Sequence, residues 1–167
     1  SGASGIILRK ATLNVTNISI TNVAKQGIWL HQASSNATIK NGAILAENRC
    51  VDTRLNVHLV LEDLNLKATT LKHGNTQPIT VGGYDDGTTI EMNNVNVDFA
   101  EGCYGYAIIS FVKTELTATN CKFTNAYNVL YAREDDASNS VFTFNNCNMY
   151  ANAPVYGPSN WFALIAI

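Results

Sequence analysis

The stretch LTATNCKFTNA, residues 116–126, decides the fold, because its pattern returns 26 residues later as FTFNNCNMYAN at 142–152. In both copies apolar residues alternate with polar ones up to an asparagine, after which the alternation changes phase. Alternation with a period of two is typical of half-buried β-strands, and the change of phase indicates a bend. We therefore expect each copy to form two short strands joined at the asparagine.

The pattern occurs six times along the chain. The residue at the bend, here called the anchor, is Asn17, Asn41, Asp63, Asn94, Asn120 or Asn146, at separations of 24, 22, 31, 26 and 26 residues. Positions two and four before the anchor, and one and three after it, are apolar or glycine in every copy. Asn and Asp tolerate the left-handed conformation that a tight bend needs. The spacing predicts a β-solenoid in which the anchors stack as a structural ladder.

A third strand precedes the other two in each turn. Its candidates are 27–32, 78–83, 107–112, 129–134 and 161–167, with a weaker one at 49–54 in the second turn. No segment has a sustained helical period, so little or no helix is expected. The sequence predicts an all-β fold, a parallel β-helix of about six rungs forming one domain over residues 1–167.

Composition excludes several classes of function. Charged residues are 14% of the chain, the net charge is −2 and the pI is about 5.8, so no basic cluster suits nucleic acid. The apolar run 161–167 is too short to span a membrane. Ser1-Gly2 is set aside as a cloning scar. Both ends of the chain lie in strands and look uncapped, which favours a fragment of a longer protein, with end-to-end stacking or homo-oligomerisation as the alternative.

The repeated stretches resemble rungs of the right-handed parallel β-helix superfamily of pectate-lyase-like proteins. That superfamily includes polysaccharide lyases, glycoside hydrolases, phage tailspikes, autotransporter passengers and surface adhesins. The resemblance implies right-handed winding and an extracellular, carbohydrate-facing setting, without selecting an activity. We expect a non-enzymatic segment of a bacterial secreted or cell-surface protein that adheres to polysaccharide or host glycan. The alternatives are part of a lyase or hydrolase acting on acidic polysaccharide, and a tailspike or autotransporter stalk.

Charged loops are the candidates for catalysis. If the chain is a lyase, the resemblance suggests Arg133 as the base and Asp135 with Asp136 as calcium ligands. A solvated charged turn is the favoured interpretation, so no cofactor is expected and calcium is the alternative. Asp85 and Asp86 suit a pair of hydrolase carboxylates, but Asp-Asp-Gly is also a common turn sequence.

Aromatic residues are the candidates for binding sugar. They are Trp29, Tyr84, Tyr104, Tyr106, Tyr127, Tyr131, Tyr150, Tyr156 and Trp161. Such rings stack against the apolar faces of sugars, and they serve equally well as packing with a polar tip. We select Trp29, His31, Tyr131 and Arg133 as ligand-binding residues. His31, His58 and His73 lack the spacing of a zinc site.

The positions of the cysteines in the repeat indicate which of them lie close enough to form a disulfide. Cys121 and Cys147 occupy one column in neighbouring turns, so their Cα atoms should lie about 4.8 Å apart. A disulfide is geometrically allowed, but free thiols packed in the core are the favoured interpretation. Cys50 and Cys103 are expected two turns apart, too far to bond.

Overall fold

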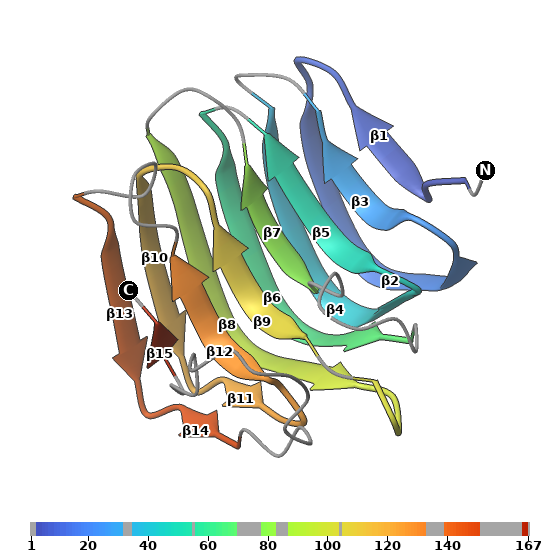
Figure 1. The fold of residues 1–167 in the computed structure, drawn as a ribbon. Helices are drawn as coiled ribbons and strands as arrows, with labels where there is room; N and C mark the ends of the chain where they lie inside the picture. The colour runs from blue at the N-terminus through green and yellow to red at the C-terminus, as the bar shows by residue number, and fades with distance from the viewer. Residues whose placement is uncertain are drawn as a thin grey trace.

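The computed structural model describes residues 3–31, 35–54, 56–69, 78–82, 87–103, 105–132, 139–150 and 165–166. Within these residues every regular element is a β-strand, and all strand pairs are parallel. The strands form two stacked sheets (Figure 1). The predicted β-solenoid is confirmed. Five complete turns separate the six anchors.

Sheet A contains the third strand of each turn. Its order is β1 (Ile6–Leu8), β3 (Gln26–Leu30), β5 (Arg49–Arg54), β7 (Ile79–Gly82), β9 (Tyr106–Ser110), β12 (Asn128–Ala132) and β15 (Ile165–Ala166). The weak candidate at 49–54 is therefore a full member, in register with both neighbours through Val51, which pairs with Ile28 and Ile79.

Sheet B contains the strands on either side of the anchor. Its order is β13 (Val141–Asn145), β10 (Thr114–Thr119), β8 (Thr88–Phe99), β6 (His58–Ala68), β4 (Asn36–Ala46) and β2 (Thr12–Val23). In the last two turns the strand divides at the anchor, and the short strands β11 (Lys122–Phe123) and β14 (Asn148–Met149) continue beyond it.

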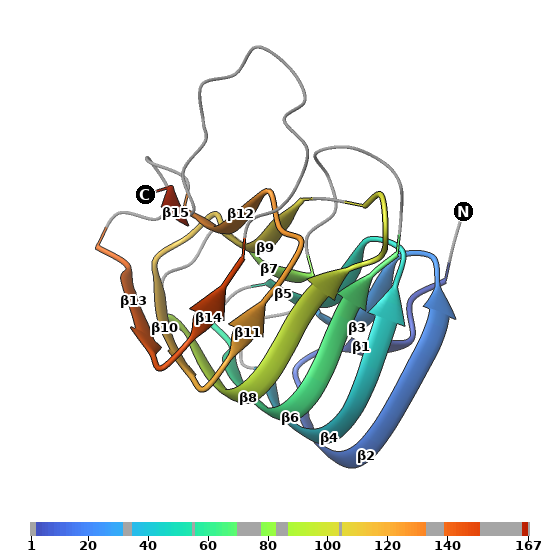
Figure 2. The same ribbon diagram turned by 90° about the horizontal axis from the view of Figure 1, so that it is seen from below.

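The chain winds in the predicted right-handed sense. In Figure 1 it ascends in sheet A, which faces the viewer, crosses over the top and descends in sheet B behind, while advancing from right to left. Figure 2, seen from below, shows that the strands of sheet B bend along their length, so that the two halves of sheet B and sheet A enclose the coil. Sheet A and sheet B therefore present separate outer faces to solvent.

All six anchors have the left-handed conformation that the sequence predicts, with φ between 51° and 61°. Asn94 Nδ2 donates to Asp63 Oδ1 at 2.6 Å, and Asn146 Nδ2 donates to Asn120 Oδ1 at 2.7 Å. These side-chain bonds join neighbouring turns at the bend. They show why an amide side chain suits this position better than glycine, which would supply the conformation alone.

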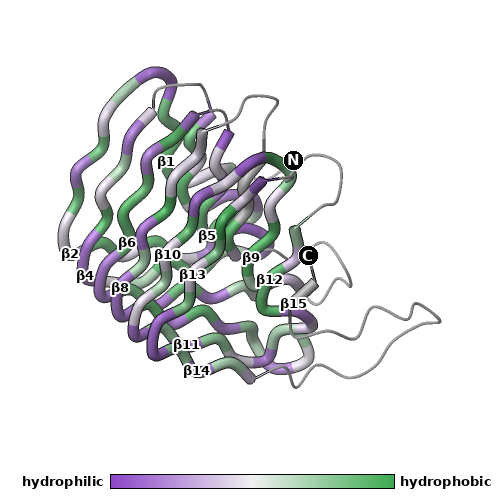
Figure 3. The backbone as a smooth tube through the Cα atoms, turned by 90° about the vertical axis from the view of Figure 1, so that its left-hand side faces the viewer, coloured by the Kyte–Doolittle hydropathy of each residue, from purple (hydrophilic) through white to green (hydrophobic). Residues whose placement is uncertain are grey.

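The core is a column of apolar side chains between the sheets. Ile39, Leu61, Leu64, Leu66 and Ile44 are at most 1% exposed, and each lies at one of the inward positions read from the repeat. Figure 3 shows the corresponding alternation of hydrophobic and hydrophilic residues along the strands of sheet B. Burying a side chain of this size contributes about 2 kcal/mol relative to leaving it exposed, so the stacked columns hold the turns together.

All four cysteines are free, as expected. No helix in the part of the chain that the structure describes has the length and apolar character needed to cross a membrane.

Candidate functional site

Trp29 and His31 lie together on the outer face of sheet A. They alternate with Ile28 and Leu30, which are fully buried, so their side chains point away from the core. The two rings have centroids 4.1 Å apart and an interplanar angle of 36°. The predicted binding residues Trp29 and His31 thus form one aromatic surface, and each of the two side chains is half-buried.

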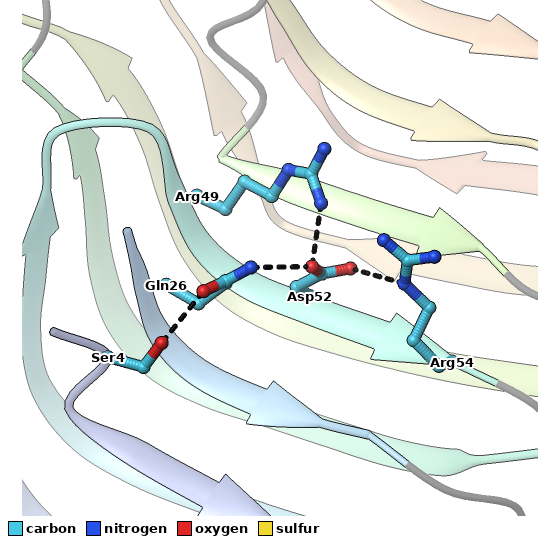
Figure 4. A network of polar contacts seen from close by, with 5 residues as sticks. All are labelled: Ser4, Gln26, Arg49, Asp52 and Arg54. Carbon is cyan, nitrogen blue, oxygen red and sulfur yellow. Dashed lines mark hydrogen bonds and ion pairs between the residues drawn. The ribbon is translucent and has the colours of Figure 1, made fainter. Parts of the chain in front are cut away.

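A buried carboxylate stands next to Trp29 on the neighbouring turn. Asp52 of β5 pairs in register with Trp29, and its side chain is fully buried although it lies on the outer face. Its Oδ2 accepts hydrogen bonds from Arg49 Nη1 at 2.7 Å and Gln26 Nε2 at 3.2 Å. Arg54 Nε lies 3.5 Å from Oδ1, as Figure 4 shows. The polar partners, rather than solvent, compensate the buried charge.

Among the residues that the structure describes, the site carries more positive than negative charge. Arg9 follows Leu8, Arg54 follows Thr53, and both Leu8 and Thr53 pair with Leu30, so the two arginines flank His31 on adjacent turns. Together with Arg49 they give three guanidinium groups, against one carboxylate from Asp52. An anionic ligand would meet a favourable potential here.

Two buried N–H groups of this site have no hydrogen-bond partner among the residues that the structure describes. They are Trp29 Nε1 and Arg49 Nε, and His31 Nδ1 is a third such nitrogen, whereas Arg54 Nε faces Asp52 Oδ1 at 3.5 Å. A buried donor without an acceptor costs free energy, and native proteins seldom leave several together. Ordered water or a ligand with acceptor oxygens would satisfy them.

Tyr131 belongs to a second aromatic group on the same face. Its ring stacks on Tyr106 at 5.1 Å, and Tyr106 meets Tyr127 edge-on at 6.0 Å. Burial raises the pKa of Tyr106, and the neighbouring tyrosines add to the effect, so its hydroxyl is a neutral donor.

The two aromatic groups are separate. Trp29 and Tyr131 share one register column, but four strand spacings of about 4.8 Å separate them. Between them in that column, Asp52 is fully buried and Ile109 is 3% exposed. No continuous exposed strip joins the groups.

Several candidates from the sequence lie outside the described residues. These are Arg133, Asp135, Asp136, Asp85, Asp86, His73, Tyr84, Tyr104, Tyr156 and Trp161. Among the residues that are described, no three metal-ligating side chains come together. His58 is engaged locally, with Nδ1 2.7 Å from Thr89 Oγ1.

Reading the sequence missed Gln26, Arg49, Asp52 and Arg54. The segment RCVDTR looked a poor strand because three of its six residues are charged. The sequence nevertheless contained a signal for this site. Arginines stand three residues before and two residues after Asp52, so they can neutralise its carboxylate from within the same strand.

The outer face of sheet B offers a weaker alternative. A shallow groove of about 530 Å³ crosses β6, β8 and β10, lined by Val60, Leu61, Glu62, Glu91, Met92, Asn93, Thr117 and Thr119. Glu62 is paired with Lys40 at 2.6 Å. None of these residues is aromatic, and the groove has no counterpart to the unpartnered donors around Trp29.

Comparisons of the chain with protein-family models, with curated proteins and with solved structures found no match.

Proposed function

We propose that the chain is a non-catalytic β-helix segment of a bacterial secreted or cell-surface protein, and that it binds carbohydrate on the outer face of sheet A. The observation that carries the proposal is the pair of adjoining rings Trp29 and His31 beside the guanidinium donors of Arg49 and Arg54. An aromatic ring supplies a surface for the apolar face of a sugar, and the donors supply partners for its oxygens.

The charge of the site favours acidic sugars over neutral ones. Arg54 is 41% exposed and its only partner among the described residues is Asp52, at 3.5 Å. A guanidinium held this loosely retains N–H groups for a carboxylate or sulfate, which it recognises with two parallel hydrogen bonds. Asp52 keeps the arginines oriented without neutralising all of them.

The experiment is a glycan-array screen of the wild-type chain, Trp29→Ala and Arg54→Gln, followed by calorimetric titration of any ligand found. We expect binding by the wild type, loss of at least about tenfold in affinity in Trp29→Ala, and a selective loss for acidic glycans in Arg54→Gln. Tyr150→Ala is the matched control, because Tyr150 is 54% exposed and directly follows β14, which is not part of sheet A.

The same glycans should be assayed for cleavage with and without calcium, because the alternative is a polysaccharide lyase or hydrolase. Intact glycans after prolonged incubation support the binding function. Calcium-dependent cleavage that Arg133→Ala abolishes would overturn it. Absence of binding to every glycan would also overturn it and would favour a structural stalk.

A further inference from the structure

Cys121 and Cys147 are held next to each other on consecutive turns. The pairs on either side of them, Thr119 with Asn145 and Lys122 with Asn148, are in register. Backbone bonds from Asn120 N to Asn145 O and from Asn148 N to Cys121 O, both 2.9 Å, fix that register. The two Cα atoms are therefore about 4.8 Å apart, within the range that a disulfide spans.

The thiol of Cys147 lies against the turn that carries Cys121. Cys147 Sγ is 3.4 Å from the carbonyl oxygens of both Ala118, on the turn of Cys121, and Asn145, on its own turn, and Cys121 Sγ donates to Thr119 O at 3.3 Å. Burial raises the pKa of Cys121 to about 11, and the adjacent Cys147 thiol adds to that shift. The Cys147 thiol is thus a side-chain neighbour of Cys121, and at neutral pH Cys121 is protonated.

The two cysteines differ in access to solvent. Cys121 is 1% exposed, whereas Cys147 is only half-buried. The difference sets an order of reaction, in which an oxidant reaches Cys147 first and Cys121 reacts second. The other cysteines lack such a neighbour: Cys50 is fully buried and bonded to Ile44 O at 3.3 Å, and Cys103 lies on another part of the coil.

We propose that Cys121 and Cys147 form a redox-active dithiol that closes to a disulfide between neighbouring turns. With oxidised glutathione as oxidant, the Cys147 thiolate attacks one sulfur, the glutathione disulfide breaks and one glutathione leaves. Cys121 then loses its proton and attacks Cys147 Sγ, and the second glutathione leaves. Two protein thiols are oxidised by two electrons, and one oxidised glutathione becomes two reduced molecules that take up the two protons.

The bond would stabilise one of the less well packed turns. In β13 and β14, Phe142, Phe144 and Met149 occupy inward positions but are only partly buried. Their counterparts one turn earlier, Leu116, Ala118 and Phe123, are at most 1% exposed. A bond from Cys147 to Cys121 fixes this turn to the better-packed one before it. Adjacent parallel strands suit a disulfide imperfectly, so the bond should be readily reducible.

The test is incubation of the wild-type chain in glutathione buffers of increasing oxidation, with thiol titration, peptide mapping and thermal melting. Of the four cysteines, two should stay reduced, and one cross-linked peptide should contain Cys121 and Cys147. The oxidised chain should melt at least about 3 °C higher, and dithiothreitol should reverse the shift.

Cys147→Ala and Cys103→Ala are the paired variants. Cys147→Ala should show no redox-dependent melting shift, while Cys103→Ala should keep it. Because Cys147 is half-buried, its replacement should leave the chain folded, which circular dichroism checks. The proposal is overturned if all four thiols stay free in the oxidising buffers, if glutathione remains attached to Cys147 without release, or if the cross-linked peptide contains Cys50 or Cys103.

Discussion

Replacing Asp52 by Asn removes the only carboxylate that the described residues place in the candidate site, while keeping its shape. In the native chain this fully buried group accepts hydrogen bonds from Arg49 and Gln26 and lies 3.5 Å from Arg54. In the variant two guanidinium groups lose their counter-charge, and the new amide turns an N–H group towards donors. Glu62→Gln is the comparison, because Glu62 makes a 2.6 Å pair with Lys40 on an exposed surface.

The burial of each ion pair determines which substitution lowers the free energy of unfolding more. Breaking a fully buried ion pair costs about 3–5 kcal/mol. Arg49 and Arg54 are 22% and 41% exposed, so water partly solvates them once the carboxylate is gone, and we expect about 2 kcal/mol for Asp52→Asn. The Lys40–Glu62 pair has side chains 42% and 33% exposed, so its loss should cost less than about 1 kcal/mol despite the shorter distance.

Equilibrium urea unfolding followed by circular dichroism measures both variants against the wild type. Asp52→Asn should lower the unfolding midpoint clearly, with an unchanged slope, and Glu62→Gln should move it little. Equal losses in the two variants, or a larger loss in Glu62→Gln, would refute the argument that burial rather than distance determines the strength of these pairs.

Two further predictions concern the coil itself. Gly42→Ala should destabilise the chain by about 2 kcal/mol, because Gly42 has φ +147° and a Cβ there would lie 1.9 Å from the carbonyl oxygen of Ile18. An unfolding midpoint equal to that of the wild type would contradict this prediction. Burial raises the pKa of Asp98, but hydrogen bonds, chiefly from Thr124 and Asn125, outweigh it and bring the pKa below its ordinary value of 3.8. The ionised Asp98 side chain therefore stabilises the folded chain fully above pH 3.8, and this stabilisation is lost as the pH falls through the folded-state pKa. Asp98→Asn should be less stable than the wild type at pH 7, and the two should differ least at pH 2. Acid unfolding of both chains measures the difference.

The fold could be predicted because its determinants are local and repeated. An anchor such as Asn94 has a left-handed conformation, and the residues around it alternate between core and solvent. The same pattern recurs in every turn. Six copies that agree in register predict the fold far better than any one copy does. The strand at 49–54 was the least certain, because Asp52 breaks the expected apolar content.

The site could be predicted only in part. Trp29 and His31 were selected as ligand-binding residues, and the structure places them in contact. The partners of Asp52 were not foreseen, since Gln26 comes from the preceding turn and only the winding of the chain brings it near. Tyr131 was grouped with Trp29, yet the spacing of the turns keeps them about 19 Å apart.

The most direct test of the account is the indole N–H signal of Trp29 in a chain labelled with nitrogen-15 at tryptophan. Trp29 and Trp161 are its two tryptophans, so Trp161→Phe assigns the spectrum. Oligogalacturonate and a cello-oligosaccharide of equal length would be titrated in parallel. If carbohydrate binds where we propose, the sugar packs against the half-buried ring of Trp29 and shifts its Nε1–H signal, more strongly with the acidic sugar. A sugar that binds without moving the Trp29 signal would contradict the assignment of the site.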